Sequence, residues 1–139
     1  MRLLVRLNVV FLAVLLAHTA DHLVRQHRNT PGELGVLGLA GLAGALLSLA
    51  LALRGHRLAP LAATLVGLVS GVGFFLVHLA PHWSAFSDPY PGLGLDAVSW
   101  TSMLAGAAAG LALGAAGARQ LLSRRASTGR RAPQYTGAR

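Results

Sequence analysis

The sequence has no cysteine and no lysine, and few of its residues carry a charge. Without cysteine, the chain has no disulfides, no thiolate metal sites and no catalytic thiol. Charged residues make up 12% of the 139 positions, about half of the share that is usual in a soluble domain. Apolar residues make up 54%, so a soluble protein of this length would have too little polar surface to cover itself. The composition therefore indicates a single-domain integral membrane protein.

Acidic residues are also scarce. Four acidic residues stand against 12 basic ones, all of them arginine, which gives a formal net charge of +8. Such a charge can indicate nucleic-acid binding, but these arginines lie at the ends of apolar runs and do not line one face. We therefore expect no nucleic-acid partner. Arginine without lysine is typical of a GC-rich genome, and we expect a bacterial protein.

Four apolar segments are long enough to cross a bilayer, which takes about 20 mostly apolar residues. The sequence predicts an all-α, polytopic membrane protein, a four-transmembrane-helix bundle over residues 1–122. Residues 123–139 are expected to form a basic, disordered cytoplasmic tail. Thr30, Pro31 and Glu33 form a capping box at the start of the second helix. The four predicted helices cover residues 3–23, 34–53, 58–80 and 97–118.

The distribution of arginine predicts the orientation, because cytoplasmic loops are enriched in basic residues. Ten of the 12 arginines lie in the N-terminus, in the turn at Arg54 and Arg57, or after the fourth helix, whereas Arg25 and Arg28 alone lie on the opposite side. Both termini are therefore expected in the cytoplasm (N-in/C-in) of a multi-pass plasma-membrane protein. The arginine-rich tail is expected to contact anionic inner-leaflet lipid, at about 1 kcal/mol per arginine near the surface.

The N-terminal segment has one alternative interpretation. Arg2 and Arg6 followed by an apolar run are also typical of a signal peptide, whose cleavage would leave three helices. Cleavage after Ala20 would place His18 where a small residue is needed, and no A-x-A motif occurs there. We therefore expect the segment to be kept as the first helix.

Glycines recur at helical spacing in three of the segments. In lipid, helices associate through small residues that let their backbones approach. We expect these glycines to make contacts within the bundle, with a homo-oligomer or docking to a larger membrane complex as alternatives. The stripes are Gly35, Gly38, Gly41 and Gly44; Gly67 and Gly71; and Gly106, Gly110 and Gly114.

Histidine and aspartate gather at the predicted outer end. His18, Asp21, His22 and Arg25 follow an i, i+3, i+4, i+7 pattern, so they share one face at the end of the first helix. The third segment ends with His78 and His82, again one turn apart, and Asp88 and Asp96 follow in the loop.

Two histidine pairs at the same depth suggest a metal site. Imidazoles one helical turn apart can bind one ion, and a facing pair can complete the ligand shell. Imidazole suits zinc, copper and iron, and an aspartate can act as a ligand or orient a histidine. We rank haem below a single ion, because the spacing allows one haem at most. The predicted metal ligands are His18, Asp21, His22, His78, His82 and Asp96.

The same residues also admit a purely structural interpretation. Pro81 disfavours helix at Ala80, which would take His82 off the face of His78. Asp96 directly precedes the fourth helix and is a good N-cap, and Arg25 can pair with an aspartate. Aromatic residues of this region are typical of an interfacial belt, namely Trp83, Phe86, Tyr90 and Trp100.

No motif in the sequence specifies a reaction. The main hypothesis is a small membrane protein with an outward-facing His/Asp metal site. One alternative is an accessory or scaffold subunit whose polar outer end is structural, and another is a metal-dependent enzyme acting at the outer leaflet. The second and third helices carry few polar residues, so a pore through one copy is not expected.

Overall fold

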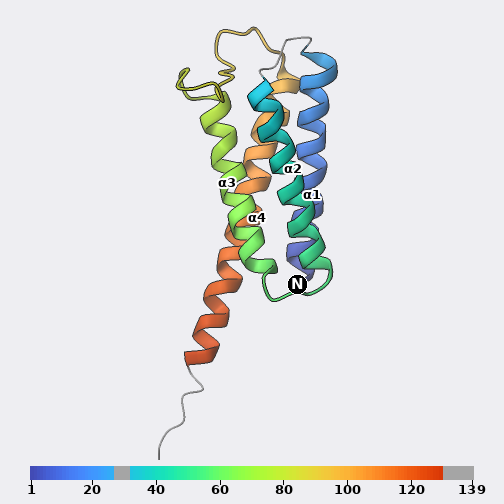
Figure 1. The fold of residues 1–139 in the computed structure, drawn as a ribbon, viewed down its shortest axis with the longest axis vertical. Helices are drawn as coiled ribbons and strands as arrows, with labels where there is room; N and C mark the ends of the chain where they lie inside the picture. Colours follow the sequence, from blue (N-terminus) through green and yellow to red (C-terminus); the bar gives the residue numbers. More distant parts are fainter. Residues whose placement is uncertain (27–31, 130–139) are drawn as a thin grey trace, which may run out of the picture.

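The computed structural model describes residues 1–26 and 32–129, which fold into four helices joined by short turns and one longer loop. The helices run up and down, and the N-terminus lies at the end away from the α3–α4 loop (Figure 1). The first helix continues from its α-helical part into a π-helical turn, η1. The elements are α1 (Arg2–Ala20), η1 (Asp21–Arg25), α2 (Gly32–Leu53), α3 (Ala59–His78) and α4 (Ala97–Gly129).

All four helices are long and apolar enough to cross a membrane, with mean hydropathies from 1.4 to 2.3 over their best windows. Many large apolar side chains on the outside of the bundle are exposed, among them Val36, Leu39 and Val69. An outer surface of this kind is suited to lipid. The predicted all-α architecture with four apolar helices is thus confirmed.

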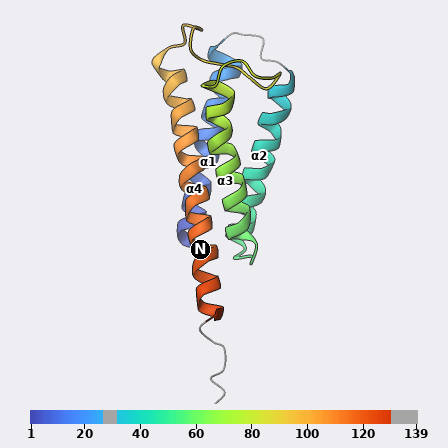
Figure 2. The same ribbon diagram turned by 90° about the vertical axis from the view of Figure 1, so that its left-hand side faces the viewer.

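Two helix ends differ from the prediction. α3 stops at His78, because the proline at position 81 prevents the helix from continuing. α4 runs on to Gly129, so residues 123–129 are helical and the predicted disordered tail is wrong for them. Good helix formers, including Gln120 and Leu121, follow the span and sustain the helix. This part of α4 projects beyond the other helices (Figure 2).

Two predictions fall outside the described residues. Thr30 and Pro31 of the expected capping box lie in the undescribed range 27–31. The remaining part of the expected tail, 130–139, also lies outside.

Glycines bring α3 and α4 into backbone contact, as the sequence predicted. A Cβ added to Gly67 would lie 2.3 Å from the backbone nitrogen of Gly114, and one added to Gly110 would lie 2.9 Å from that of Gly71. Distances this short leave no room for a methyl group. The two glycine stripes therefore interlock as one interface between α3 and α4.

The glycine stripe of α2 behaves differently, and the predicted bundle contacts are wrong for most of it. A Cβ added to Gly35, Gly38 or Gly41 would meet nothing within 4 Å, whereas one added to Gly44 would meet Val66 at 3.4 Å. The residues of α2 that are buried lie in its second half, at Ala45, Ser48 and Ala52. The glycines in the first half of α2 thus face no other described residue, although Leu42 packs against the core.

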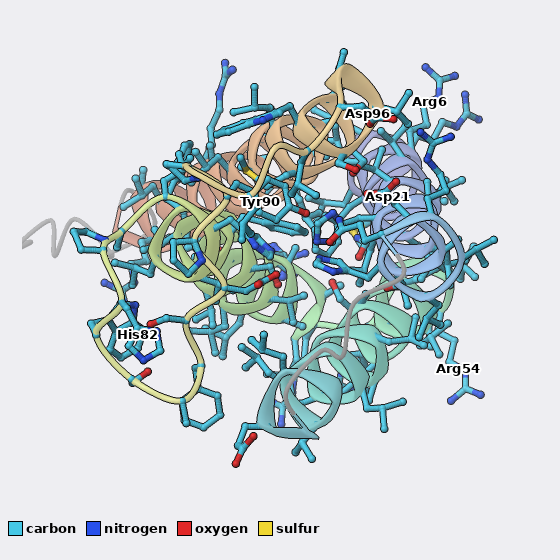
Figure 3. The ribbon with its side chains drawn as sticks, turned by 90° about the horizontal axis from the view of Figure 1, so that it is seen from above. Arg6, Asp21, Arg54, His82, Tyr90 and Asp96 are labelled. Carbon is cyan, nitrogen blue, oxygen red and sulfur yellow. The ribbon has the colours of Figure 1, made fainter. Side chains whose placement is uncertain are left out.

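The helices are arranged as a ring in which α1 packs on α2 and α4, and α3 packs on the same two helices. α1 and α3 are therefore diagonal partners across the bundle axis (Figure 3). Apolar side chains such as Leu4, Phe11 and Leu15 fill the axis along most of α1. At the end that carries the α3–α4 loop, the buried residues become polar, and this end holds the candidate site.

Candidate metal centre

Three histidines meet on the bundle axis at the end that carries the α3–α4 loop. His18 comes from α1, His22 from η1, and His78 is the last residue of α3. One nitrogen of each ring lies within 4.8 Å of one nitrogen of the other two. His18 and His78 are buried and His22 is half-buried. In the described part of the chain, these three form the one group of histidine and carboxylate residues with metal-ligand spacing.

The rings pack directly against one another. The centroid of the His18 ring lies 4.6 Å from that of His22 and 5.1 Å from that of His78, both edge to face. His22 and His78 stack at 5.4 Å. Phe74 contributes an apolar wall, with its ring 4.9 Å from that of His18. The cluster is therefore compact enough for one ion.

The π-helical turn carries the second histidine and brings Gln26 next to Asp21. Its backbone closes an i→i+5 hydrogen bond, from Gln26 N to Asp21 O at 3.0 Å. In an α-helix with 3.6 residues per turn, a side chain five positions on would lie on the far side. The wider turn brings Gln26 over Asp21 instead, and the Gln26 amide donates to the Asp21 carboxylate at 2.9 Å. Single π-helical turns of this kind are frequent at functional sites.

The tautomer of His18 follows from its hydrogen bond to α4. Nδ1 of His18 lies 3.2 Å from Oγ of Ser102, and Ser102 donates its own proton to the carbonyl of Ser99. A hydroxyl has one proton, so Ser102 accepts here and His18 donates from Nδ1. The lone pair of His18 is then on Nε2, where a metal can bind.

His78 has the same tautomer for a different reason. Its Nδ1 lies 3.2 Å from the backbone carbonyl oxygen of Asp88, which can only accept a hydrogen bond. His78 therefore donates from Nδ1 and carries its lone pair on Nε2. The loop is held in place for this contact by two backbone bonds to α3, from Asp88 N to Val77 O and from Tyr90 N to His78 O, both at 2.8 Å.

Tyr90 contacts two of the three histidines. Its ring centroid lies 4.5 Å from that of His78, and its hydroxyl lies 3.3 Å from Nε2 of His22. The Gln26 amide donates to the same hydroxyl at 3.1 Å. Because Nε2 of His22 faces Tyr90, Nδ1 is the His22 nitrogen suited to a metal. Tyr90 is 1% exposed, so it belongs to the core and not, as the sequence predicted, to the interfacial belt.

Asp21 and Asp96 meet at Arg25 and not at the histidines. Arg25 donates from Nε to Asp21 at 3.0 Å and from a terminal nitrogen to Asp96. Asp96 also caps α4, accepting from the backbone nitrogens of Val98 and Ser99 at 3.0 Å each. The Ser99 N–H and the positive charge of Arg25 hold the pKa of Asp96 below its usual value. The N-cap and ion-pair interpretations of these residues are thus confirmed.

His82 lies apart from the cluster. It is exposed in the loop after α3, and Figure 3 shows it on the opposite side of Tyr90 from Asp21 and Asp96. Its predicted pairing with His78 on one helical face is wrong, because α3 ends at His78. Of the predicted ligands, the structure therefore gathers His18, His22 and His78, while a ligand role for Asp21, His82 or Asp96 stays a prediction.

A haem does not fit this arrangement. Two axial histidines need room for a flat macrocycle between their rings. His22 lies against both His18 and His78, and Phe74 and Tyr90 pack on the same rings. The cluster suits a single ion and leaves no space for the larger cofactor.

Sequence reasoning missed several residues that hold the histidines. Ser102 lies one turn inside α4 and Gln26 lies at the end of a turn whose π-helical form had no sequence signal. Ser102 could have been noticed as a polar residue in an apolar span, since such residues are costly in lipid unless bonded. Comparison of the chain with protein-family models, with curated proteins and with solved structures found no match.

Proposed function

We propose that this chain is a plasma-membrane protein, with both termini in the cytoplasm, that binds one transition-metal ion through His18, His22 and His78. The observation that carries the proposal is the convergence of three imidazoles, from two diagonal helices, within 4.8 Å. Four helices of spanning length support insertion, and the arginine distribution supports the orientation. In that orientation, the metal centre lies near the outer surface.

The nitrogen geometry supports this ligand set. His18 and His78 donate from Nδ1 to Ser102 and to the Asp88 carbonyl, which leaves Nε2 of each ring to bind the ion. Such outer hydrogen bonds are characteristic of metal-binding histidines, because they fix the ring and raise its basicity. In the proposed site, the Tyr90 hydroxyl 3.3 Å from Nε2 of His22 would accept from that nitrogen, which leaves Nδ1 of His22 to bind the ion.

The donor set also limits the kind of metal. Three neutral imidazoles, with no thiolate in the chain, suit zinc, copper or ferrous iron better than magnesium or calcium, which prefer oxygen ligands. Three protein ligands leave one position of a tetrahedral ion for water or a small molecule. The proposed site is therefore a coordinatively open centre.

The test is the metal content of the purified full-length protein, stripped with a chelator and reloaded with zinc, copper or iron. We expect about one ion per chain, and loss of that ion in the His18→Ala and His78→Ala variants. His82→Ala and His56→Ala are matched controls, because both residues are exposed and lie away from the cluster. Less than a tenth of an ion per chain for every metal, or equal loss in the controls, would overturn the proposal.

One observation favours a second function, that of an accessory subunit. A Cβ added to Gly35, Gly38 or Gly41 would meet no described atom within 4 Å, unlike one added to the glycine stripes of α3 and α4. Because the chain has no cysteine, a Gly38→Cys variant supplies one thiol per copy, and oxidation in membranes can join it only to a second copy or to a cysteine of another protein at this face. A crosslink to a different protein would support docking through α2, whereas a crosslink between two copies, or a monomeric band alone, would count against the accessory role.

A further inference from the structure

A groove opens between α1 and α2 at the end of the bundle away from the histidines. It has a volume of about 380 Å³ and lies where α1 begins and α2 ends. Val5, Ala52 and Leu53 form its apolar part, and Arg2 and Arg6 supply its charge. Its full lining is Met1, Arg2, Val5, Arg6, Ala52, Leu53 and Gly55.

The two arginines of this groove have no carboxylate partner in the described part of the chain. Arg2 and Arg6 are exposed, and within residues 1–26 and 32–129 neither of them forms an ion pair. The four acidic residues of the chain all lie at or near the opposite end, at positions 21, 33, 88 and 96. The groove is therefore positively charged, and the described residues supply no carboxylate near it.

Because Arg6 lies deeper along the helix than a surface arginine, binding of an anionic ligand is more favourable at Arg6. Arg6 lies one turn along α1 from Arg2, about 6 Å further into the span. A charged group near the edge of the hydrocarbon is stabilised when it reaches a phosphate at the interface. Arg54, in the turn after α2, lies on the same side of the molecule as Arg6 (Figure 3) and adds to the positive charge.

We propose that this groove binds an anionic phospholipid of the inner leaflet. The phosphate lies between the guanidinium groups of Arg2 and Arg6, and an acyl chain lies along Val5, Ala52 and Leu53. Basic pockets between membrane helices on the cytoplasmic side are suited to such head groups. The inference rests on the proposed insertion and orientation, but it is independent of the metal centre, which lies at the other end of the bundle.

The site differs from the basic surface of α4. Arg124 donates to the backbone carbonyl of Arg57, and Arg119 lies on the helix without lining the groove. These residues attract any anionic surface by charge alone. The groove, by contrast, combines two arginines with apolar walls, so it requires both a phosphate and a hydrocarbon chain.

The experiment uses native mass spectrometry of the full chain in a neutral detergent, titrated with dioleoyl phosphatidylglycerol or dioleoyl phosphatidylcholine. We expect a retained phosphatidylglycerol adduct and a weaker phosphatidylcholine one. The variant Arg2→Gln/Arg6→Gln should weaken the phosphatidylglycerol adduct by about tenfold or more. The matched control Arg119→Gln/Arg125→Gln removes the same charge at the same end and should change it less than about twofold.

Two further arms separate the possible outcomes. Arg6→Lys keeps the charge and should retain most of the binding, and millimolar glycerol phosphate should not displace the lipid, because it lacks the acyl chain. Equal binding of the two lipids, equal losses in the two double variants, or displacement by glycerol phosphate would each overturn the inference. Metal content, measured on the same samples, reports separately on the histidine site.

Discussion

The imidazole rings of His18 and His78 lie edge to face with their centroids 5.1 Å apart, across the diagonal of the bundle. Their helices have few other contacts, since α1 and α3 are separated by α2 and α4 along most of their length. The histidines therefore meet only because both face the axis at the same depth. Their position depends on the whole bundle, so variants that disturb the bundle and variants that disturb the site need to be distinguished.

Removing the hydroxyl of Ser102 should weaken metal binding without removing a ligand. Ser102 accepts from Nδ1 of His18 and so keeps the lone pair of His18 on Nε2. Loss of such an outer hydrogen bond typically lowers metal affinity by about 10- to 100-fold. We expect this loss for Ser102→Ala in a competitive titration with a chelator. Thr101→Ala, whose hydroxyl bonds the Ala97 carbonyl, is the control, and equal affinities of the two variants would contradict the assigned tautomer.

Replacing Tyr90 by phenylalanine should destabilise the metal-free protein. The buried hydroxyl contacts His22 at 3.3 Å and Gln26 at 3.1 Å, and both groups lose a partner in the variant. A buried polar group without its partner costs about 1–3 kcal/mol. Thermal unfolding in detergent should show this loss of stability for Tyr90→Phe. The loss should be smaller for Trp83→Phe, because the hydrogen bond that the Trp83 indole donates to the Leu76 carbonyl is exposed. A larger effect at Trp83 would show that Tyr90 does not hold the site together.

A methyl group at Gly67 should disrupt the interface of α3 and α4. The added Cβ would lie 2.3 Å from the Gly114 nitrogen, and backbone atoms cannot move aside as a side chain can. Overpacking of this kind costs about 1–3 kcal/mol and occasionally more. Gly73→Ala on the same helix is the control, because its Cβ meets nothing within 4 Å, and alanine favours helix by up to about 1 kcal/mol. Denaturant unfolding of both variants in micelles measures the difference, and equal stabilities would refute the interlocked packing.

Acidification should weaken the link between η1 and α4. The Ser99 N–H and Arg25 lower the pKa of Asp96 in the folded protein, relative to an unfolded value of about 3.9. The stabilisation is therefore complete above the unfolded pKa and is lost as the pH falls through the folded one. We expect the melting temperature of the wild type to fall more than that of Asp96→Asn between pH 5 and pH 3. Asparagine can still cap α4 but has no charge to titrate, so identical pH profiles would rule out a contribution from this carboxylate.

Much of the architecture could be predicted because the bilayer imposes simple requirements on a sequence. The apolar runs around Leu37 and Leu68 match the length of a span, and the predicted helices agree with α2 and α3 to within a few residues. The predicted end of the fourth helix, at residue 118, was wrong. Polar residues after an apolar segment are equally compatible with a continuing helix and with disorder. The predicted bundle contacts of the α2 glycines were also wrong for most of the stripe. The spacing of residues shows which of them share a helical face but not what that face contacts.

The sequence by itself determined the four apolar helices, the gathering of histidine and aspartate toward one end, and the glycine stripes of α3 and α4 that pack within the bundle. These features depend on local patterns, namely hydrophobic length, helical periodicity and residue size. Tertiary structure alone decided which polar residues form the cluster. It brought His78 of α3 to the His18–His22 pair, carried Gln26 to Asp21 and Tyr90 through a π-helical turn, folded the α3–α4 loop so that Tyr90 is buried beside the histidines, and left His82 exposed. The physical reason is that a ligand set depends on directions in space between helices and loops, and spacing along one helix does not specify those directions.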